Sequence, residues 1–321
     1  MKYLHVAEQP EGGRYVASLR EIATPIPGRG EVLIRVTASG VNRADLSQIA
    51  GRYPPPPGES EILGLEVSGL RDDTGERVCA LLAGGGHAEY VAAPVGQVFP
   101  APAGLDLTIG AGIPEAFLTA FLNLVVEGGL PRDAKVVVHA GASGVGLAAI
   151  QIAKLGGARV AATTRTPEKL DALETAGADL AVDASRAEVV AEVEAHWGRD
   201  AVDVVLDPIG AASLAADLAV VKVGGRIVIL STMSGSRAEL DLALLMKKRA
   251  RVIGSTLRSR SRAEKAALVA RFRDEILPGF ADGKLTVIAD SVFPVERAAE
   301  AFQRMRENRN VGKVLISWSG T

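Results

Sequence analysis

The sequence predicts an α/β protein in which a six-stranded, doubly wound parallel sheet follows a β-rich first part. Two observations carry this prediction. From residue 135 to residue 256, short runs of valine, isoleucine and alanine alternate with segments of helical periodicity, as in a parallel sheet covered by helices. Before residue 118, short alternating strands are separated by glycine and proline turns, which is typical of a small barrel-like domain.

Each element can be placed along the chain from its pattern of apolar residues. In the first part we expect strands at residues 15–20, 31–41, 62–69, 77–82 and 87–92, a short helix at 42–51 and a longer helical stretch at 105–129. In the second part we expect strands at 135–138, 160–164, 180–182, 202–207, 226–231 and 251–256, with helices between them. Two amphipathic helices near 262–281 and 295–308 and a strand at 314–317 complete the pattern.

Length and composition restrict the function classes. A chain of 321 residues can form two domains with cores of their own. A net charge of -2 provides no basic excess for nucleic acid or an anionic membrane. The single cysteine, Cys79, excludes an internal disulfide and a cysteine-built metal site, and no run of about 18 apolar residues could span a membrane. Since residues 1–6 also lack the apolar core of a signal peptide, we expect a cytoplasmic protein.

The strand at 135–138 runs directly into a glycine-rich turn and then into a helix, which is the entry of a dinucleotide-binding βαβ unit. Gly141 permits the sharp turn, Gly144 lets the backbone approach a pyrophosphate, and Gly146 lets the helix pack closely on the strand. Ser143 stands where the usual fingerprint has its second glycine. The N–H groups of the first helical turn, that of Val145 included, would face the phosphates. The alternative is an ordinary strand-to-helix turn.

The residues after the second strand of this unit indicate which dinucleotide binds. An NAD site has an acid about 20 residues past the glycine turn, where it binds the ribose 2′-hydroxyl. This chain has no acid there, and instead offers the cations Arg165 and Lys169 and the hydroxyl of Thr164, which suit a 2′-phosphate. We therefore predict NADPH as the cofactor. The alternative is a solvated helix start, with Thr166 as N-cap and Pro167 as the first helical residue.

A set of motifs spread over nearly the whole chain carries a resemblance to a known family. These motifs lie at residues 41–45 (VNRAD), 51–56 (GRYPPP), 63–66 (LGLE), 113–120 (IPEAFLTA), 139–146 (HAGASGVG), 254–258 (GSTLR) and 310–313 (NVGK). The chain resembles the zinc-free medium-chain dehydrogenase/reductases of the quinone oxidoreductase branch, and looks most like the tumour-suppressor-inducible quinone oxidoreductase subgroup. The resemblance implies a GroES-like catalytic domain built from residues 1–118 and 258–321, with a Rossmann domain of residues 119–257 inserted. It also implies a homodimer joined through the Rossmann sheet edges.

The same resemblance suggests that no metal is used. The zinc-dependent relatives have a cysteine where Asn42 stands and a histidine where Leu65 stands, and a catalytic zinc needs three protein ligands of N, S or O type. Leucine cannot ligate a metal, and the relay hydroxyl beside the zinc is replaced by Ala44. We expect Asp45 and Glu66 to act as structural hydrogen-bond partners.

Site residues are also implied by the resemblance. Asn42, Tyr53 and Thr119 would surround the acceptor. Ser231, Ser255, Thr256, Leu257 and Lys313 would line the cofactor side. The Tyr53 hydroxyl can donate a proton to a quinone oxygen, or its ring can simply pack on the prolines that follow it. Asn42 can donate to a carbonyl oxygen or cap a turn. One expected cofactor contact is missing, because Asp183 and Ala184 stand where the NADP branch often has Asn-Tyr.

The functional hypothesis is an NADPH-dependent, zinc-independent reductase of quinones or related conjugated carbonyls, such as enones. A 2-enoyl thioester reductase is the nearest alternative. An NADPH-binding protein with an RNA-binding or structural role is the alternative from another class. The basic runs at 247–249 and 258–262 are interpreted as solvated faces, so no nucleic-acid partner is expected, and His139 is interpreted as structural.

Overall fold

The computed structural model describes residues 1–9 and 13–318, which form two compact units. One unit contains residues 1–118 and 257–321, so we call it the split unit. The other contains residues 119–256, and we call it the inserted unit. None of the helices in the described ranges is long and apolar enough to cross a bilayer.

A parallel sheet forms the centre of the inserted unit. Its strands run in the order β10 (Leu180–Asp183), β9 (Arg159–Thr164), β8 (Lys135–Val138), β11 (Val202–Asp207), β12 (Val221–Ile229) and β13 (Arg251–Gly254). The valines of β8 and β11 are buried because helices cover both faces of the sheet. This order, which reverses between β8 and β11, confirms the doubly wound six-stranded sheet.

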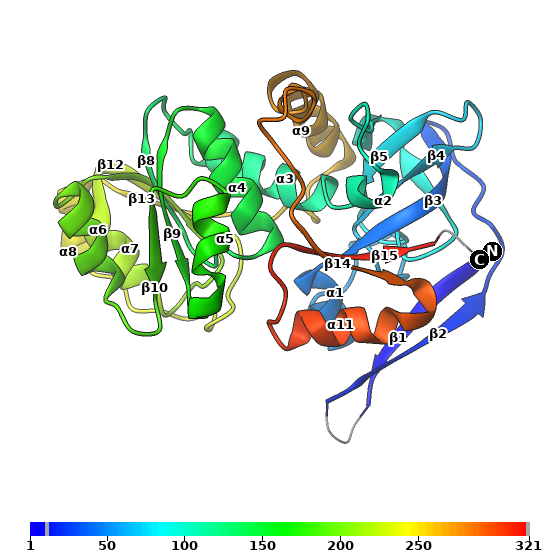
Figure 1. The fold of residues 1–321 in the computed structure, drawn as a ribbon, viewed down its shortest axis with the longest axis horizontal. Coiled ribbons are helices and arrows are strands. Elements are labelled where there is room, and N and C mark those ends of the chain that lie inside the picture. The colour runs from blue at the N-terminus through cyan, green and yellow to red at the C-terminus, as the bar shows by residue number, and fades with distance from the viewer. Residues whose placement is uncertain (10–12, 319–321) are drawn as a thin grey trace. The chain divides into compact units, whose positions relative to one another are not determined.

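Helices cover the two faces of this sheet (Figure 1). α4 (Gly144–Leu155) and α5 (Leu170–Thr175) lie on one side, and α6 (Val189–Trp197), α7 (Leu214–Val220) and α8 (Leu242–Lys248) lie on the other. α5 follows a 3₁₀ turn, η3 (Pro167–Lys169), at the predicted helix start. The core between the sheet and α6–α7 includes Val205, Leu218 and Ile227, all at most 1% exposed. The helical spacing of apolar residues in the sequence therefore corresponds to the faces that these helices bury against the sheet.

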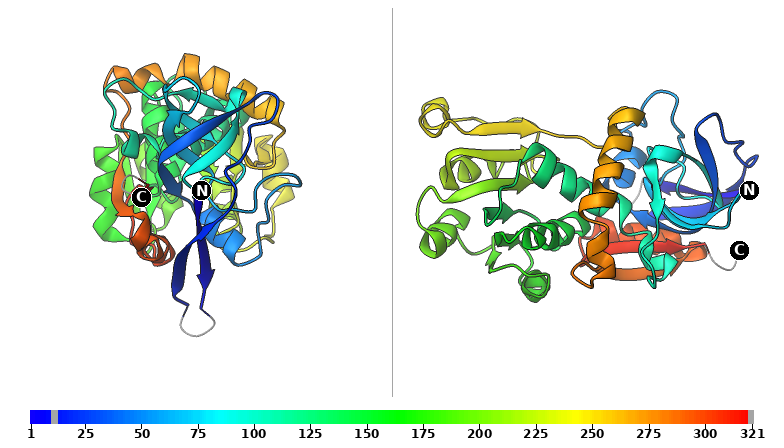
Figure 2. Two further views of the ribbon diagram at one scale, coloured as in Figure 1. Left: turned by 90° about the vertical axis from the view of Figure 1, so that its right-hand side faces the viewer. Right: turned by 90° about the horizontal axis from the view of Figure 1, so that it is seen from above.

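The split unit contains a mostly antiparallel sheet. Its strands run in the order β14 (Ala289–Pro294), β15 (Lys313–Ser317), β3 (Glu31–Val41), β4 (Glu66–Arg71), β5 (Arg77–Leu81) and β7 (Val98–Pro100), and β6 (Tyr90–Pro94) also pairs with β3. β15 pairs with β3 so that Val314 lies opposite Val41. This register joins the two segments of the unit and brings Lys313 beside the end of β3. A separate ribbon of β1 (Lys2–Glu8) and β2 (Tyr15–Glu21) stands apart from this sheet (Figure 2).

The helices of the split unit are shorter than predicted. α1 (Arg43–Ile49), η1 (Val95–Gln97) and α2 (Leu107–Gly110) precede α3 (Pro114–Phe121). The split unit's first segment ends at Leu118 within α3, and the π-helix η2 (Leu122–Glu127) that follows belongs to the inserted unit. The helix expected at 262–281 is divided into α9 (Arg262–Glu275) and α10 (Pro278–Ala281), because a helix usually ends before the residue preceding a proline. The helix expected at 295–308 begins with the 3₁₀ turn η4 (Val295–Arg297) and continues as α11 (Ala298–Arg306).

Candidate functional site

The turn from β8 into α4 is held by backbone contacts. Ala140 adopts the left-handed conformation, with φ 50°, so the sharp turn assigned to Gly141 is in fact made one residue earlier. The Gly141 N–H donates to the Thr163 carbonyl at 2.8 Å. A Cβ on Gly146 would lie 2.5 Å from the Ala140 carbonyl oxygen, so only glycine fits there. The glycine at 146 therefore lets α4 start directly against the turn.

The first turn of α4 is a ready anion site. Ser143 is the N-cap, and its hydroxyl accepts from the Gly146 N–H at 3.0 Å. The N–H groups of Gly144 and Val145 come before the first intrahelical bond, which Leu147 donates to the Ser143 carbonyl. They lie at the carboxyl end of β8, where the strand order reverses, and the helix dipole favours negative charge there. Ser143 thus has a capping role at the fingerprint's second glycine position.

Buried polar side chains form a hydrogen-bonded network beside this turn. His139 Nε2 lies 2.7 Å from Asp217 Oδ1, and its Nδ1 lies 3.0 Å from the Thr163 hydroxyl. Burial alone would lower the pKa of His139, but the Asp217 carboxylate outweighs it and the pKa is raised. Burial raises the pKa of Asp217 to about 6. His139 is therefore held on both ring nitrogens, which agrees with a structural role; the sequence contained no signal for its partner 78 residues away.

The end of β9 carries the residues predicted to select the dinucleotide. Thr164 is buried and its hydroxyl accepts from the Thr166 N–H at 3.2 Å. Arg165 is exposed, and Lys169 is partly buried. Asp183 is the register partner of Thr164 on β10, so an acid does stand beside this edge. Its carboxylate, however, accepts from the backbone and hydroxyl of Ser185, which lowers its pKa.

Two buried hydroxyls of the inserted unit have no hydrogen-bond partner in the described part of the chain. They are those of Thr119, on α3, and Ser255, directly after β13. A buried hydroxyl without a partner costs stability unless a ligand or water satisfies it. Ser231 and Thr256 are exposed, and Leu257 is the first residue of the second segment of the split unit.

Asn42 forms the N-cap of α1 in the split unit. Its backbone N–H donates to Asp45 Oδ2 at 2.8 Å, and Asp45 Oδ1 accepts from the Gly64 N–H at 3.0 Å. The Asn42 side chain donates to Glu66 Oε1 at 2.9 Å and to the Gly40 carbonyl at 3.2 Å. Both amide protons are therefore used within the protein, so neither is available for donation to an acceptor in this structure.

Tyr53 lies in the loop after α1, with the Arg258 guanidinium 5.2 Å from the centre of its ring. Arg258 is buried and donates to the backbone carbonyls of Tyr53 (3.1 Å) and Ala83 (2.8 Å) and to Gln48 Oε1 (2.7 Å). Arg258 thus holds both the ring and the backbone of Tyr53. No residue within 1–9 and 13–318 hydrogen-bonds to the Tyr53 hydroxyl. Burial raises the pKa of this phenol, and Glu115 adds to the rise.

Lys313 lies in the split unit, at the start of β15, and not among the residues of the inserted unit. Its ammonium contacts Asn42 and Glu66. Glu115 lies beside this group, because its backbone N–H donates to Glu66 Oε2 at 2.8 Å. Burial, followed by the charge of Glu66, raises the pKa of Glu115 to about 8. Glu115 is a titratable group that the sequence analysis did not single out.

The residues around Asn42 do not fit a catalytic zinc ion. Leu65 cannot ligate, and the Asn42 side-chain oxygen already accepts from the Lys313 ammonium at 2.7 Å. Among the described residues there is no group of three or more His, Cys, Asp or Glu side chains that could hold a metal ion.

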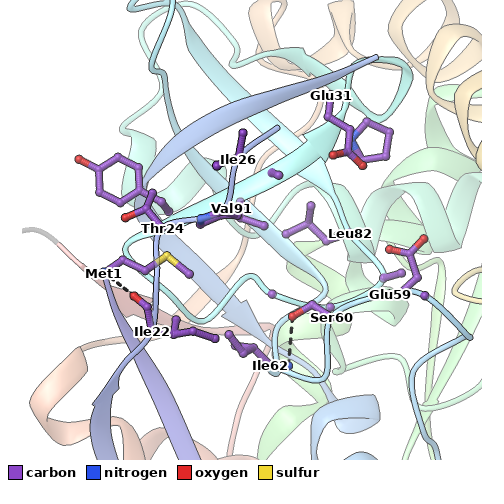
Figure 3. A pocket seen from close by; sticks show the side chains of 18 of the residues that line it. Met1, Ile22, Thr24, Ile26, Glu31, Glu59, Ser60, Ile62, Leu82 and Val91 are labelled. Atoms are coloured by element: carbon purple, nitrogen blue, oxygen red, sulfur yellow. Dashed lines mark hydrogen bonds between the residues drawn. The ribbon is translucent and has the colours of Figure 1, made fainter. Parts of the chain in front are cut away.

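A separate cavity of about 580 Å³ lies in the split unit (Figure 3). Apolar side chains such as Ile22, Ile62 and Leu82 line it. Its charged rim is internally paired, because Arg262 lies 2.7 Å from Glu31 and 3.5 Å from Glu59. The lining includes none of the site residues predicted from the sequence.

Comparisons with known proteins agree with the fold. A family model described as "Alcohol dehydrogenase GroES-like domain" matches residues 28–103, and one described as "Zinc-binding dehydrogenase" matches residues 144–272. A quinone oxidoreductase of Lama guanicoe is 30% identical, over 98% of this chain and 97% of that protein. The Homo sapiens quinone oxidoreductase is 29% identical over 95% of this chain and 94% of its own length.

Solved structures resemble the chain over nearly all of its length. The quinone oxidoreductase from Thermus thermophilus, determined alone and in complex with NADPH, is 32% identical with a TM-score of 0.83, covering 99% of this chain and 100% of that one. An NAD-dependent alcohol dehydrogenase is 30% identical with a TM-score of 0.84, covering 99% of both chains.

Proposed function

This chain belongs to the medium-chain dehydrogenase/reductase family, in its quinone oxidoreductase branch, and on that premise we propose that it transfers a hydride from NADPH to quinones or related conjugated carbonyls without zinc. The observation that carries the proposal is Tyr53, a phenol whose ring and backbone are fixed by Arg258 while its hydroxyl has no partner in the described chain. A fixed, protonated donor is what a quinone oxygen needs as it gains charge.

The reaction needs one hydride and one proton. NADPH, when bound, supplies the hydride, which carries both electrons to the acceptor. The Tyr53 hydroxyl donates the proton to the acceptor oxygen and regains one from water, so that a quinone and NADPH become a hydroquinone and NADP⁺. The raised pKa of Tyr53 keeps the hydroxyl protonated at neutral pH.

On the cofactor side, the N–H groups of Gly144 and Val145, beyond the Ser143 cap, would bind the pyrophosphate. Arg165 and Lys169 would bind the 2′-phosphate, with Thr164 beside them. The unpaired hydroxyls of Thr119 and Ser255, with Ser231, Thr256 and Leu257, would face the nicotinamide end. A bound ligand would satisfy the two buried hydroxyls.

Zinc has no place in the proposed site, because the side chains at Asn42 and Leu65 do not fit it. The proposal also includes a homodimer, a small-molecule acceptor as the partner, and a cytoplasmic location, which the single cysteine favours.

The test is a screen of NADPH oxidation with three acceptor classes: quinones, enals or enones, and 2-enoyl thioesters. We expect turnover with quinones and conjugated carbonyls. Turnover confined to thioesters would replace the proposed acceptor class. Tight NADPH binding without reduction of any acceptor would favour a non-enzymatic role.

A further inference from the structure

Lys265 occupies a core position of helix α9 in the split unit. Its backbone N–H donates to the carbonyl of the N-cap residue Ser261 at 3.0 Å, so it lies at the start of the helix. The buried side chains of α9 are those of Lys265, Leu268, Val269 and Phe272. Because Lys265 is only 2% exposed, a charged side chain stands where the helix otherwise packs apolar residues against the unit.

The ammonium of Lys265 has no hydrogen bond or ion pair with another residue in the described part of the chain. The charges of Glu59 and Glu115 act on it from a distance. Glu59 lies 3.5 Å from the Arg262 guanidinium instead, and Glu115, whose pKa is raised to about 8, is mostly protonated at neutral pH. Burial lowers the pKa of Lys265, since a buried ammonium without a paired anion is unfavourable. A bound anion would remove this penalty.

The other buried cations of the split unit do have partners. Arg258 donates hydrogen bonds to two backbone carbonyls and to a glutamine side-chain oxygen. The Lys313 ammonium contacts two side-chain oxygens and one carbonyl. Buried polar groups are normally satisfied in this way, and one that is not calls for an explanation. We therefore look for the partner of Lys265 in a ligand.

Lys265 lies in the same part of the split unit as Tyr53. The charge of Glu115 acts on both side chains, and that of Arg258, whose guanidinium is 5.2 Å from the centre of the Tyr53 ring, also acts on Lys265. Charges act over about 10 Å in dilute salt, so these groups are neighbours. The Tyr53 hydroxyl, the protonated Glu115 carboxyl and the Lys265 ammonium are then donors without an acceptor in the described residues. Such a set suits a ligand that has several oxygen atoms and a negative charge.

We propose that Lys265 binds an anionic substituent of the acceptor, so that quinones or enones with a carboxylate or sulfonate group are preferred over their uncharged counterparts. The identity of the ligand as the acceptor rests on the proposed function. Tyr53 donates to the oxygen that is reduced, and Lys265 holds a second group of the same molecule. A charge-assisted hydrogen bond in a buried site is strong and weakly screened, so it can select between two such acceptors.

Binding is tested at equilibrium, without turnover. 2-Naphthoate and the uncharged 2-naphthylmethanol differ in one substituent, and neither accepts a hydride. By calorimetric titration of the full chain, without cofactor and with NADP⁺ present, we expect 2-naphthoate to bind at least tenfold more tightly, and Lys265→Met to abolish this difference. Lys284→Met removes a lysine of the same unit that is 63% exposed and should preserve it. Equal affinities in the unmodified protein would overturn the proposal, whether or not a quinone is reduced.

The kinetic test compares anthraquinone-2-sulfonate with the uncharged 2-(hydroxymethyl)anthraquinone. Lys265→Met should lower kcat/KM for the sulfonate about tenfold or more and change that for the uncharged quinone less than twofold. Lys265→Arg keeps the charge and should retain part of the preference. Equal losses for both quinones would overturn the substituent site and leave quinone reduction itself standing.

The melting temperature provides a readout that a structural role of Lys265 would move in the opposite direction. Methionine fills a core position without an unpaired charge, so Lys265→Met should raise the melting temperature while it weakens 2-naphthoate binding. Lys284→Met should leave both nearly unchanged. A lower melting temperature of Lys265→Met would reveal a stabilising partner within the protein and would overturn the proposal.

Discussion

Tyr53 is the side chain on which the proposed chemistry depends. Its ring is covered by the Arg258 guanidinium, and that same arginine bonds its backbone carbonyl. The prolines that follow Tyr53 restrict the loop further. Because the side chain is ordered before the acceptor arrives, little entropy is lost when the hydroxyl donates.

We predict that Tyr53→Phe lowers quinone turnover by about 10- to 100-fold, or roughly 1.4–2.7 kcal/mol, because a proton from water then replaces the phenol. NADPH affinity, measured by fluorescence titration, should be unchanged. Tyr3→Phe, in the same unit, is the control and should behave like the unmodified protein. Full turnover of Tyr53→Phe with every quinone tried would mean that the ring only packs on its prolines.

Arg165 and Lys169 are predicted to select NADPH over NADH. Removing a charge-assisted phosphate contact costs about 1.5–3 kcal/mol, so the double change to alanine should raise the NADPH Michaelis constant about tenfold or more. The value for NADH should hardly move. Arg186→Ala removes an 80% exposed arginine near Asp183 and serves as the control. Equal losses for both cofactors would assign these cations to the fold alone.

At the scale of elements, helix α3 places a titratable carboxyl in the split unit. Burial and Glu66 raise the pKa of Glu115 from 4.5 to about 8. The folded state therefore holds a proton that the unfolded state releases. This contribution to stability is complete below about pH 4.5 and is lost as the pH rises through about 8.

We therefore expect the unmodified protein to lose about 1–3 kcal/mol of unfolding free energy between about pH 4.5 and about pH 8, after a discount for partial exposure. Glu115→Gln should flatten this dependence, whereas Glu275→Gln, at an exposed position of α9, should not. Urea unfolding at a series of pH values measures both. An equal slope in Glu115→Gln and the unmodified protein would refute the assignment.

The strands of the inserted unit could be predicted because their signals are local. β8 and β11 are buried valine runs bounded by turn residues. β14 was missed because most of its residues are half-exposed, and β7 because it is only three residues long. Neither strand has a clear apolar pattern of its own.

The polar clusters of the site depend on pairing between distant segments. Lys313 and Glu66 are 247 residues apart in the sequence, and the pairing of β15 and of β4 with β3 brings them together. His139, directly after β8, meets Asp217 because Asp217 lies on α7, a helix that packs on the inserted sheet. The motif residues could be identified from the sequence alone. Which of them form charge pairs depends on tertiary contacts between distant segments.

At the scale of the whole molecule, β13 is an edge strand of the inserted sheet. Val252 is 37% exposed there. An edge strand with exposed apolar side chains is a natural surface for symmetric pairing of two chains. This placement supports the proposed homodimer.

We expect light scattering at micromolar concentration to give a dimer mass, and Val252→Lys to shift it toward the monomer, because a charge on the edge opposes strand pairing. Val292→Lys provides a matched control on β14, the edge strand of the other sheet, and should leave the mass unchanged. A monomer mass for the unmodified protein would contradict the dimer.

Two-electron reduction of a quinone by NADPH without a metal can be followed in an anaerobic single turnover. Protein treated with a chelator and shown by elemental analysis to lack zinc is mixed with NADPH and a quinone, and NADPH loss and hydroquinone formation are followed together. We expect about one hydroquinone to form for each NADPH oxidised, at a rate that added zinc does not increase. Oxidation of NADPH only after zinc is restored, or two semiquinones formed per NADPH, would contradict it.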